Sequence, residues 1–314
     1  MSENSKKSSA FNYDKTEDQI NLVEMLLYFW KHKLLAISVA LTLAIVGAVV
    51  SKLLPDIYES SALLAPNETD NNSGMAAIGN QFGGLASLAG IALPNAGASK
   101  VTLALELLKS RVFISEFIRK YHLEADIYAT ESWDKEKGEL IYDKSIFDVE
   151  SGAWTREKGE PTILEVYDIF LEDHLVISAN EKSNFVNISV RHFSPHWAQE
   201  VLTNLVSELN EKIRAMDIKS SAKSISYLED RLKETQVDDM RKVLFRLMER
   251  EFQKKMLAEV KDGYVFYTVD PPVVPEYPRW PKRILIVLIS FIAGLVISFT
   301  GITLVYSFRR EFKS

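Results

Sequence analysis

The side chains with the best spacing for chemistry are two histidines, His192 and His196, which lie four residues apart as metal ligands on a helix often do. Pro195 stands between them at a predicted strand-to-helix junction, and the sequence offers no third ligand beside them. The chain contains no cysteine. This absence excludes thiol nucleophiles, disulfides, iron–sulfur clusters and cysteine-based zinc sites. We therefore expect no metal site and no bound cofactor.

Acidic side chains also cluster, at Asp238-Asp239 and at Glu249 and Glu251. Lys and Arg residues alternate with them, which is typical of a solvated helix face held by pairs one turn apart. We expect no catalytic residue among them, and no enzyme. The whole chain has 314 residues with 37 basic and 43 acidic side chains, a net charge of −6. This balance does not favour nucleic-acid binding.

Small residues and prolines form the remaining patterns. Ser290, Gly294, Ser298 and Gly301 recur at about one-turn spacing within an apolar run, where small residues let helices approach closely in lipid. Ordinary membrane composition is the alternative interpretation. Four prolines are spaced by three, which would align their rings along one edge of a polyproline II strut. This strut is predicted for 271–281, as a docking edge or as a plain rigid spacer. Its prolines are Pro272, Pro275, Pro278 and Pro281.

Two apolar runs near the ends of the chain must position these residues. Each spans about 30 Å as a helix, the thickness of a hydrocarbon core. We predict transmembrane helices at 34–54 and 283–308. The first run begins some thirty residues into the chain and has no cleavage site after it, so we expect a retained anchor and not a signal peptide.

The basic residues outside the runs predict the orientation. They are Lys31 and Lys33 before the first run and Arg309, Arg310 and Lys313 after the second. Positive charge favours the cytoplasmic side. We therefore expect a cytoplasmic segment at 1–33, a cytoplasmic tail at 309–314, and a periplasmic domain at 55–282. Neither flanking segment is long enough for an enzyme or signalling domain.

The predicted fold class is α+β: two transmembrane helices flank a periplasmic α/β base domain with a very long protruding helix. The Gly- and Ala-rich segment 74–98 reads as a loop, or as a weakly apolar segment that lines an assembly or touches lipid. The elements expected in the base are strands at 55–66, 175–179, 185–191 and 264–269 and a helix from Ser99 to Tyr121.

The long helix is predicted at about 195–262. Ser194 can cap it and Pro195 suits its first turn. Neither glycine nor proline follows from His196 to Lys261, and apolar residues recur at helical spacing. Unbroken, it would reach about 100 Å, with the polar stretch 217–224 as the place to bend or break. A helix this long cannot bury its apolar stripe on its own domain, so we expect neighbouring copies to cover it.

Several stretches carry a resemblance to a known family. They are DQINLVEMLLYFWKHK before the first run, YESSALLAP after it, SISYLEDRLKET and LMEREFQKKMLAEV in the long helix, and DPPVVPEYPRWPKR before the second run. With this order of elements the chain resembles the chain-length determinant family, the Wzz-type polysaccharide co-polymerases. No GxxxxGK[ST] motif is present, so it resembles the kinase-free class.

The resemblance implies a bacterial inner-membrane protein that forms a homo-oligomeric ring of about eight protomers. Its partners would be a membrane-embedded O-antigen polymerase, the lipid-linked glycan and membrane lipid. The ring would set the modal length of lipopolysaccharide O-antigen or a related glycan. The proline strut and the small residues of the second run would then be candidates for contacting the polymerase or neighbouring copies.

A second hypothesis comes from a different class of protein. A two-span periplasmic receptor, or an efflux or secretion adaptor with a coiled-coil hairpin, would share the order of elements. The lack of a cytoplasmic output domain argues against the receptor. The second apolar run, with the proline segment leading into it, argues against the adaptor.

Overall fold

The structure of the chain is a computed structural model that describes residue 30 and residues 33–67, 99–180, 185–260 and 263–311. The predicted Gly- and Ala-rich segment 74–98 lies outside the described residues. The chain divides into two compact units. One contains Met1–Leu54 with Lys282–Ser314, and the other is Pro55–Pro281.

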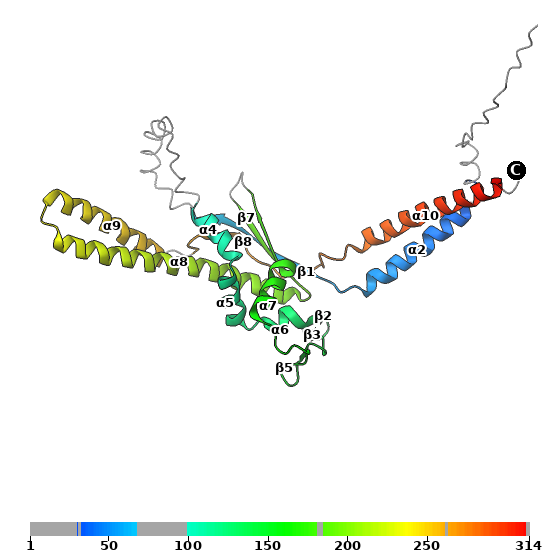
Figure 1. The fold of residues 1–314 in the computed structure, drawn as a ribbon, viewed down its shortest axis with the longest axis horizontal. Coiled ribbons are helices and arrows are strands. Elements are labelled where there is room, and N and C mark those ends of the chain that lie inside the picture. Colours follow the sequence, from blue (N-terminus) through cyan, green and yellow to red (C-terminus); the bar gives the residue numbers. More distant parts are fainter. Residues whose placement is uncertain (1–29, 31–32, 68–98, 181–184, 261–262, 312–314) are drawn as a thin grey trace, which may run out of the picture. The chain divides into compact units, whose positions relative to one another are not determined.

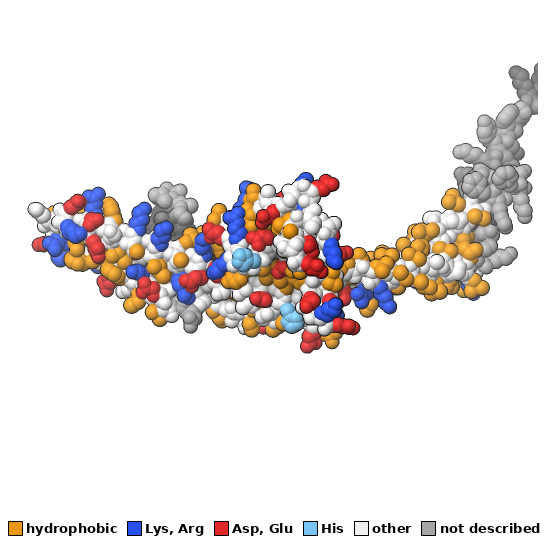
Figure 2. Space-filling view, turned by 90° about the horizontal axis from the view of Figure 1, so that it is seen from below, with side chains coloured by type: hydrophobic (Ala, Val, Ile, Leu, Met, Phe, Trp, Pro, Cys, Tyr) orange, Lys and Arg blue, Asp and Glu red, His pale blue; other side chains and the backbone are white. Residues whose placement is uncertain are grey.

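The first unit is a pair of apolar helices, α2 (Lys33–Leu53) and α10 (Arg283–Glu311), which run side by side in opposite directions (Figure 1). Both are long and apolar enough to cross a membrane, over Lys33–Leu53 and Arg283–Val305. Hydrophobic side chains make up most of the coloured surface of this pair (Figure 2). Such a surface is unfavourable in water and suits a hydrocarbon environment.

The second unit is built on a four-stranded antiparallel sheet with the strand order β6-β7-β1-β8. Its strands are β1 (Tyr58–Pro66), β6 (Leu175–Ala179), β7 (Val186–His192) and β8 (Phe266–Asp270). The predicted hairpin of β6 and β7 is confirmed. The last predicted strand is also found, as β8, which begins two residues later than expected and pairs with β1.

Helices cover one face of this sheet and complete a single core. They are α4 (Ser99–Leu108), α5 (Arg111–Tyr121), α6 (Glu124–Ala129), α7 (Ile163–Ile169), the π-helical turn η2 (Phe170–His174) and the first half of α8 (Pro195–Glu234). Alternate residues of β7, Val186, Ile188 and Val190, are buried against them. This alternation is the period of two that places every second side chain on one face of a strand.

The helix expected from Ser99 to Tyr121 is in fact two helices, because the chain breaks at Lys109 and Ser110. The carbonyl of Lys109 accepts a 2.7 Å hydrogen bond from the hydroxyl of Tyr167. A tertiary contact thus occupies a carbonyl that an unbroken helix would use. The side chain of Leu108 is fully buried just before the break.

Two small sheets complete the base: β2 (Thr130–Asp134) with β3 (Glu139–Tyr142), and β4 (Phe147–Asp148) with β5 (Ala153–Trp154). Tryptophans anchor both. The Trp133 ring meets Tyr58 edge-on at 5.8 Å, and the Trp154 ring lies 5.0 Å from Phe147.

The expected single helix at 195–262 is a helical hairpin of two antiparallel helices, α8 (Pro195–Glu234) and α9 (Asp238–Val260) (Figure 1). The break falls at 235–237 and not in the polar stretch 217–224. Thr235 has an extended backbone, and two acidic residues, Asp238 and Asp239, favour the start of a new helix by opposing its dipole. The prediction of one helix was therefore wrong, while its start was right: Ser194 accepts a hydrogen bond from the Trp197 amide, and Pro195 opens the helix.

Candidate functional site

The small residues of the two apolar helices lie where those helices cross most closely. A Cβ atom on Gly294 would lie 2.6 Å from the Cα atom of Ala40, and one on Gly47 would lie 2.3 Å from the Ser290 hydroxyl oxygen. Ser298 is buried as well, whereas a Cβ on Gly301 would meet nothing within 4 Å. Ser290 and Gly294 therefore serve contacts within one chain, and Gly301 has no such neighbour among the described residues.

The proline segment, residues 271–281, shows its period of three in its burial. Pro272, Pro275 and Pro278 are half-buried and Pro281 is buried, while every other residue of the segment is exposed. The proline rings thus face the base domain. The edge offered to a partner is the opposite one, formed by the residues between the prolines.

Backbone and side-chain contacts fasten this segment to the base. Ile57 pairs with Trp280, whose carbonyl accepts a 2.9 Å hydrogen bond from the Ile57 amide. The Ser60 hydroxyl donates a 2.9 Å bond to the carbonyl of Val273. The Gln199 side chain reaches the carbonyl of Pro272 at 3.5 Å. The segment is therefore held at both ends and is not a free linker.

The opposite edge carries four exposed apolar side chains, which we call the outer strip: Val273, Val274, Tyr277 and Trp280. The exposed side chains of Glu276 and Arg279 lie between them in the sequence. Tyr277 is 80% exposed and Trp280 is 44% exposed. Contiguous exposed apolar and aromatic side chains mark contact surfaces more often than isolated ones do. The outer strip and not the proline edge is thus the candidate for docking.

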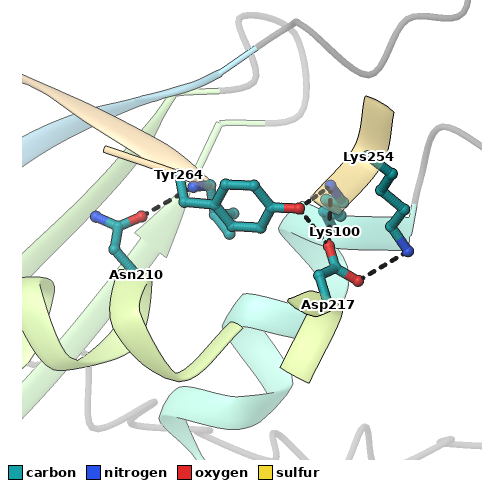
Figure 3. Close-up of polar contacts among 6 residues, drawn as sticks. Lys100, Asn210, Asp217, Lys254 and Tyr264 are labelled. Carbon is teal, nitrogen blue, oxygen red and sulfur yellow. Dashed lines mark hydrogen bonds and ion pairs between the residues drawn. The ribbon is translucent and has the colours of Figure 1, made fainter. Parts of the chain in front are cut away.

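A second group of residues fixes the helical hairpin to the base. We call Lys100, Asp217, Lys254 and Tyr264 the Asp217 cluster; they come from α4, α8, α9 and the turn after α9 (Figure 3). One carboxylate oxygen of Asp217 lies 3.1 Å from the Lys100 ammonium, and the other lies 3.0 Å from that of Lys254. The Tyr264 hydroxyl donates a 2.6 Å hydrogen bond to the same carboxylate.

The Asp217 cluster is consistent with an ionised carboxylate. Burial opposes the charge, but the hydrogen bonds from Tyr264, Lys254 and Lys100 outweigh it and lower the pKa of Asp217. Burial and the bond to Asp217 raise the pKa of Tyr264 to about 12, so the phenol stays protonated as a donor. The Lys100 ammonium also lies 4.6 Å from the centre of the Tyr264 ring, a cation–π distance.

Asn210, about two turns before Asp217 on α8, holds the returning chain. Its side-chain oxygen accepts hydrogen bonds from the amides of Val265 and Phe266, at 2.9 and 3.0 Å. The turn that leads there needs glycine, because Gly263 has φ +65° and a Cβ atom would lie 2.8 Å from the Phe266 carbonyl oxygen. Asn210 and the Asp217 cluster together set where the hairpin leaves the base (Figure 3).

Of the two histidines considered as metal ligands, only His192 lies in a buried aromatic stack. His196 is exposed, and its ring lies 6.3 Å from the Trp133 ring. The His192 ring lies 4.0 Å from the Trp197 ring, almost parallel to it. Its Nδ1 accepts from the Ser194 amide at 3.2 Å, so its Nε2 is the donor to the Asp126 carbonyl, also at 3.2 Å. Both ring nitrogens are thus engaged by the protein. Over the described ranges, no group of three His, Cys, Asp or Glu side chains could hold a metal ion.

Burial keeps this stack neutral. It lowers the pKa of His192 to about 3, helped by the nearby His174, and it lowers the pKa of His174 as well. His174 hydrogen-bonds the Arg191 carbonyl at 2.7 Å. These contacts give the two histidines a packing role in the base.

Beyond Ile213, the helical hairpin leaves most of its apolar residues exposed. Of the 23 residues of α9, only Ala258 is buried. Beyond Ile213, only Ser221 and Ile225 of α8 are buried. The exposed large apolar side chains of α9 are Met240, Val243, Phe245, Leu247, Phe252, Met256, Leu257 and Val260. A helix with so many exposed apolar side chains presents a surface on which a partner can pack.

The charges of the hairpin form the solvated face that the sequence predicts. Lys242 pairs with Asp239 at 3.0 Å, and Lys233 pairs with Asp230 at 3.1 Å, each one turn apart. All four side chains are more than two-thirds exposed. Such pairs contribute little to stability.

Sequence reasoning missed the Asp217 cluster, although one signal for it exists. Buried residues of α8 recur every four positions, and Asp217 continues that stripe directly after Ile213. An acidic residue on the buried stripe of a helix needs a partner. The partners, Lys100, Lys254 and Tyr264, are 37 or more residues away in the sequence, and no local pattern points to them.

Residues 18–121 match the family model described as "Chain length determinant protein". The match runs from before α2 through β1 and α4 to the end of α5, about a third of the chain. This stretch of the chain is therefore similar to the chain length determinant family. No curated protein matches the chain in sequence. A solved "full-length bacterial polysaccharide co-polymerase" covers 94% of this chain and 100% of its own, at 14% identity and a TM-score of 0.36; a similarity this distant supports no inference.

Proposed function

We propose that this chain is a chain length determinant: a non-catalytic protein of the bacterial inner membrane that sets the modal length of a lipid-linked glycan, lipopolysaccharide O-antigen or a related polysaccharide. It acts as a homo-oligomer, a ring of copies, beside a separate membrane-embedded polymerase. Helices α2 and α10 span the membrane, both termini are cytoplasmic, and residues 55–282 lie in the periplasm. The family match supports the role in chain length.

The observation that carries the assembly is the uncovered helical hairpin. Its second helix buries a single residue, Ala258, while eight large apolar side chains of that helix stay exposed. Burying apolar surface stabilises by about 25 cal/mol for each Å² removed from water. Copies that stand side by side would gain this energy along the length of the hairpin.

The Asp217 cluster and Asn210 give every copy the same hairpin geometry. A closed ring requires that each copy meet the next at one fixed angle. Because these residues tie α4, α8, α9 and the returning chain together, the hairpin meets the base with a defined orientation. The number of copies then follows from this geometry.

The outer strip of the proline segment is the proposed contact with the polymerase. It is exposed and carries apolar and aromatic side chains, and only two residues, Pro281 and Lys282, separate Trp280 from the first residue of α10, a span of at most about 11 Å. Substituting Tyr277 by Ser should alter glycan length without lowering protein level. Pro275→Ala, on the inward edge, is the matched variant for a structural effect.

The direct test is deletion of the gene in a smooth bacterial strain, with the lipopolysaccharide ladder resolved on a gel. We expect the modal band to disappear and a plasmid copy of the wild type to restore it. A ladder that keeps its modal band after deletion would refute the O-antigen form of the proposal. Profiling capsular and other surface polysaccharides in the same strain covers the related glycans.

The second candidate function is an efflux or secretion adaptor, and the antiparallel pairing of α8 with α9 favours it. Adaptors of this kind use a periplasmic helical hairpin to meet a partner. An unchanged polysaccharide profile on deletion, together with a dimeric or trimeric mass in detergent, would support the adaptor over the length regulator.

A further inference from the structure

The crossing of α2 and α10 leaves a groove near one end of the helix pair. Its volume is about 540 Å³, within the range of small-molecule sites. The walls are apolar and come from both helices: Ala44, Ala48, Val287, Leu288 and Phe291. Small side chains on α2 open the groove, and Phe291 forms part of the opposite wall.

Two basic side chains, Lys52 and Arg283, line the same groove. Lys52 is in the last turn of α2 and Arg283 is the first residue of α10, so both stand at the end where the apolar helices stop. No acidic side chain is among the groove's lining residues. The backbone N–H groups at the start of α10 add to the positive potential there. The groove is thus lined by apolar side chains along its length and by two basic side chains at one end.

Ser51 lines the groove beside Lys52. Its hydroxyl is buried and has no hydrogen-bond partner within the described part of the chain. Buried hydroxyls are nearly always paired, because an unpaired one loses its hydration without compensation. A ligand with acceptor oxygens at this basic end would provide the missing partner after a change of the Ser51 rotamer.

We propose that this groove binds one anionic phospholipid, with a hydrocarbon chain along Ala48 and Val287 and the phosphate between Lys52 and Arg283. The arrangement of an apolar channel that ends in two cations matches the layout of such a lipid. A phospholipid is favoured over a scarcer lipid-linked phosphate by its abundance in the bilayer. The inference rests on the proposed membrane-spanning role of α2 and α10.

The bound lipid would fix the spacing of the two helices at this end. The helices are in direct contact where Gly294 meets Ala40 and where Gly47 meets Ser290, and the groove lies beside these contacts, toward Lys52 and Arg283. A lipid chain would fill this space with close packing. Its phosphate would lie at the end of the groove lined by the two basic side chains.

The test uses the full chain, delipidated in detergent and titrated with phosphatidylglycerol or with zwitterionic phosphatidylcholine, with bound lipids counted by native mass spectrometry. Two basic side chains near a membrane surface should favour the anionic lipid by about tenfold or more. Lys52→Gln combined with Arg283→Gln should abolish this preference. Ala48→Phe, which fills the groove, should reduce binding of both lipids.

Lys282→Gln is the matched control, because Lys282 is a basic neighbour that does not line the groove; it should bind lipid as the wild type does. Equal binding of the two lipids by the wild type, or an anionic preference that survives the double substitution, would overturn the inference. Retained binding in Ala48→Phe would also overturn it. A polyprenyl diphosphate that displaces phosphatidylglycerol at equal concentration would overturn the choice of a phospholipid.

A separate measurement tests the proposed membrane-spanning role of α2 and α10, on which this inference rests. The chain has no cysteine, so a label at Val296→Cys on the exposed side of α10 reports membrane insertion after reconstitution into vesicles. If nitroxide lipids fail to quench that label, the membrane-spanning role fails. If they quench it and the lipid preference is absent, only the groove proposal fails.

Discussion

The Tyr264 hydroxyl donates a 2.6 Å hydrogen bond to the carboxylate of Asp217, and so joins the chain returning from the helical hairpin to the middle of α8. The ammonium groups of Lys100 and Lys254 form ion pairs with the same carboxylate. Four segments that are distant in sequence therefore meet at one partly buried charge. Beyond this point α8 and α9 pack against each other as the helical hairpin.

The first prediction concerns this charge. Asp217→Asn leaves Lys100 and Lys254 without their counter-charge, so the hairpin should be held less firmly. We expect a loss of about 1–3 kcal/mol, as for other hydrogen-bonded groups whose partner is removed. Thermal unfolding of the full chain in detergent measures the loss, and amide hydrogen exchange should rise at 254–266.

Asp230→Asn is the control for the loss of a carboxylate on the same helix. Asp230 pairs with Lys233 on the exposed surface, and such pairs contribute about 0–1 kcal/mol. Equal effects of the two substitutions would show that the Asp217 cluster has no special role.

The second prediction concerns the closest approach of α2 and α10. In Gly294→Leu the new side chain must enter space held by the backbone of Ala40, which cannot rotate away. Overpacking of this kind costs about 1–3 kcal/mol. Thermal unfolding in detergent should therefore begin at a lower temperature than in the wild type.

Gly301→Leu is its partner variant, because nothing described lies within 4 Å of a Cβ atom there. It adds the same apolar bulk to the same helix and should leave the unfolding temperature unchanged. If Gly301→Leu were the more harmful of the two, the helices would cross differently from the structure.

The third prediction is a pH dependence from the buried histidines. Their pKa values in the folded chain lie below the value of about 6.5 for a free histidine, at about 3 for His192. Below about pH 6.5 the unfolded chain therefore binds more protons than the folded chain. Stability should be complete above pH 6.5 and should fall as the pH drops, by up to about 1.4 kcal/mol per pH unit for each histidine.

Most carboxylates stay ionised between pH 7 and pH 5, so a change in unfolding temperature over this range reports mainly on the histidines. His192→Asn keeps an acceptor for the Ser194 amide and removes one titrating group, so its stability should depend less steeply on pH. An unchanged slope in both His192→Asn and His174→Asn would contradict the assignment.

Local sequence patterns predicted those parts of the fold that are determined by residues near one another in the sequence. The two apolar runs, the Ser194-Pro195 helix start and the alternation of Val186, Ile188 and Val190 each follow from residues near one another. They correspond to α2 and α10, to the start of α8 and to β7. The period of three in the prolines also appears in their burial.

The remainder depends on contacts between distant residues. The sequence continues at helical spacing through Thr235, and only the packing of α9 on α8 reveals that the chain turns back there. The inward direction of the prolines depends on Ser60 and Gln199. The assembly of the Asp217 cluster depends on Lys100 and Tyr264, which no period relates to Asp217.

The fourth prediction tests the central claim, that copies of this chain assemble through the exposed face of the hairpin. Val243 and Leu247 lie one turn apart on α9 and are both exposed. Val243→Glu with Leu247→Glu should separate the copies, because charges would be buried between them. Arg241→Glu, a charge change on the same helix, should leave the assembly intact.

The decisive measurement is the mass of the full chain in mild detergent, by light scattering or native mass spectrometry. For the wild type and for Arg241→Glu, the account predicts an assembly well above a trimer, while the double glutamate variant should fall toward a single protomer of 35.6 kDa. A wild-type protein that stays at 35.6 kDa, or an assembly that the double substitution leaves unchanged, would contradict it.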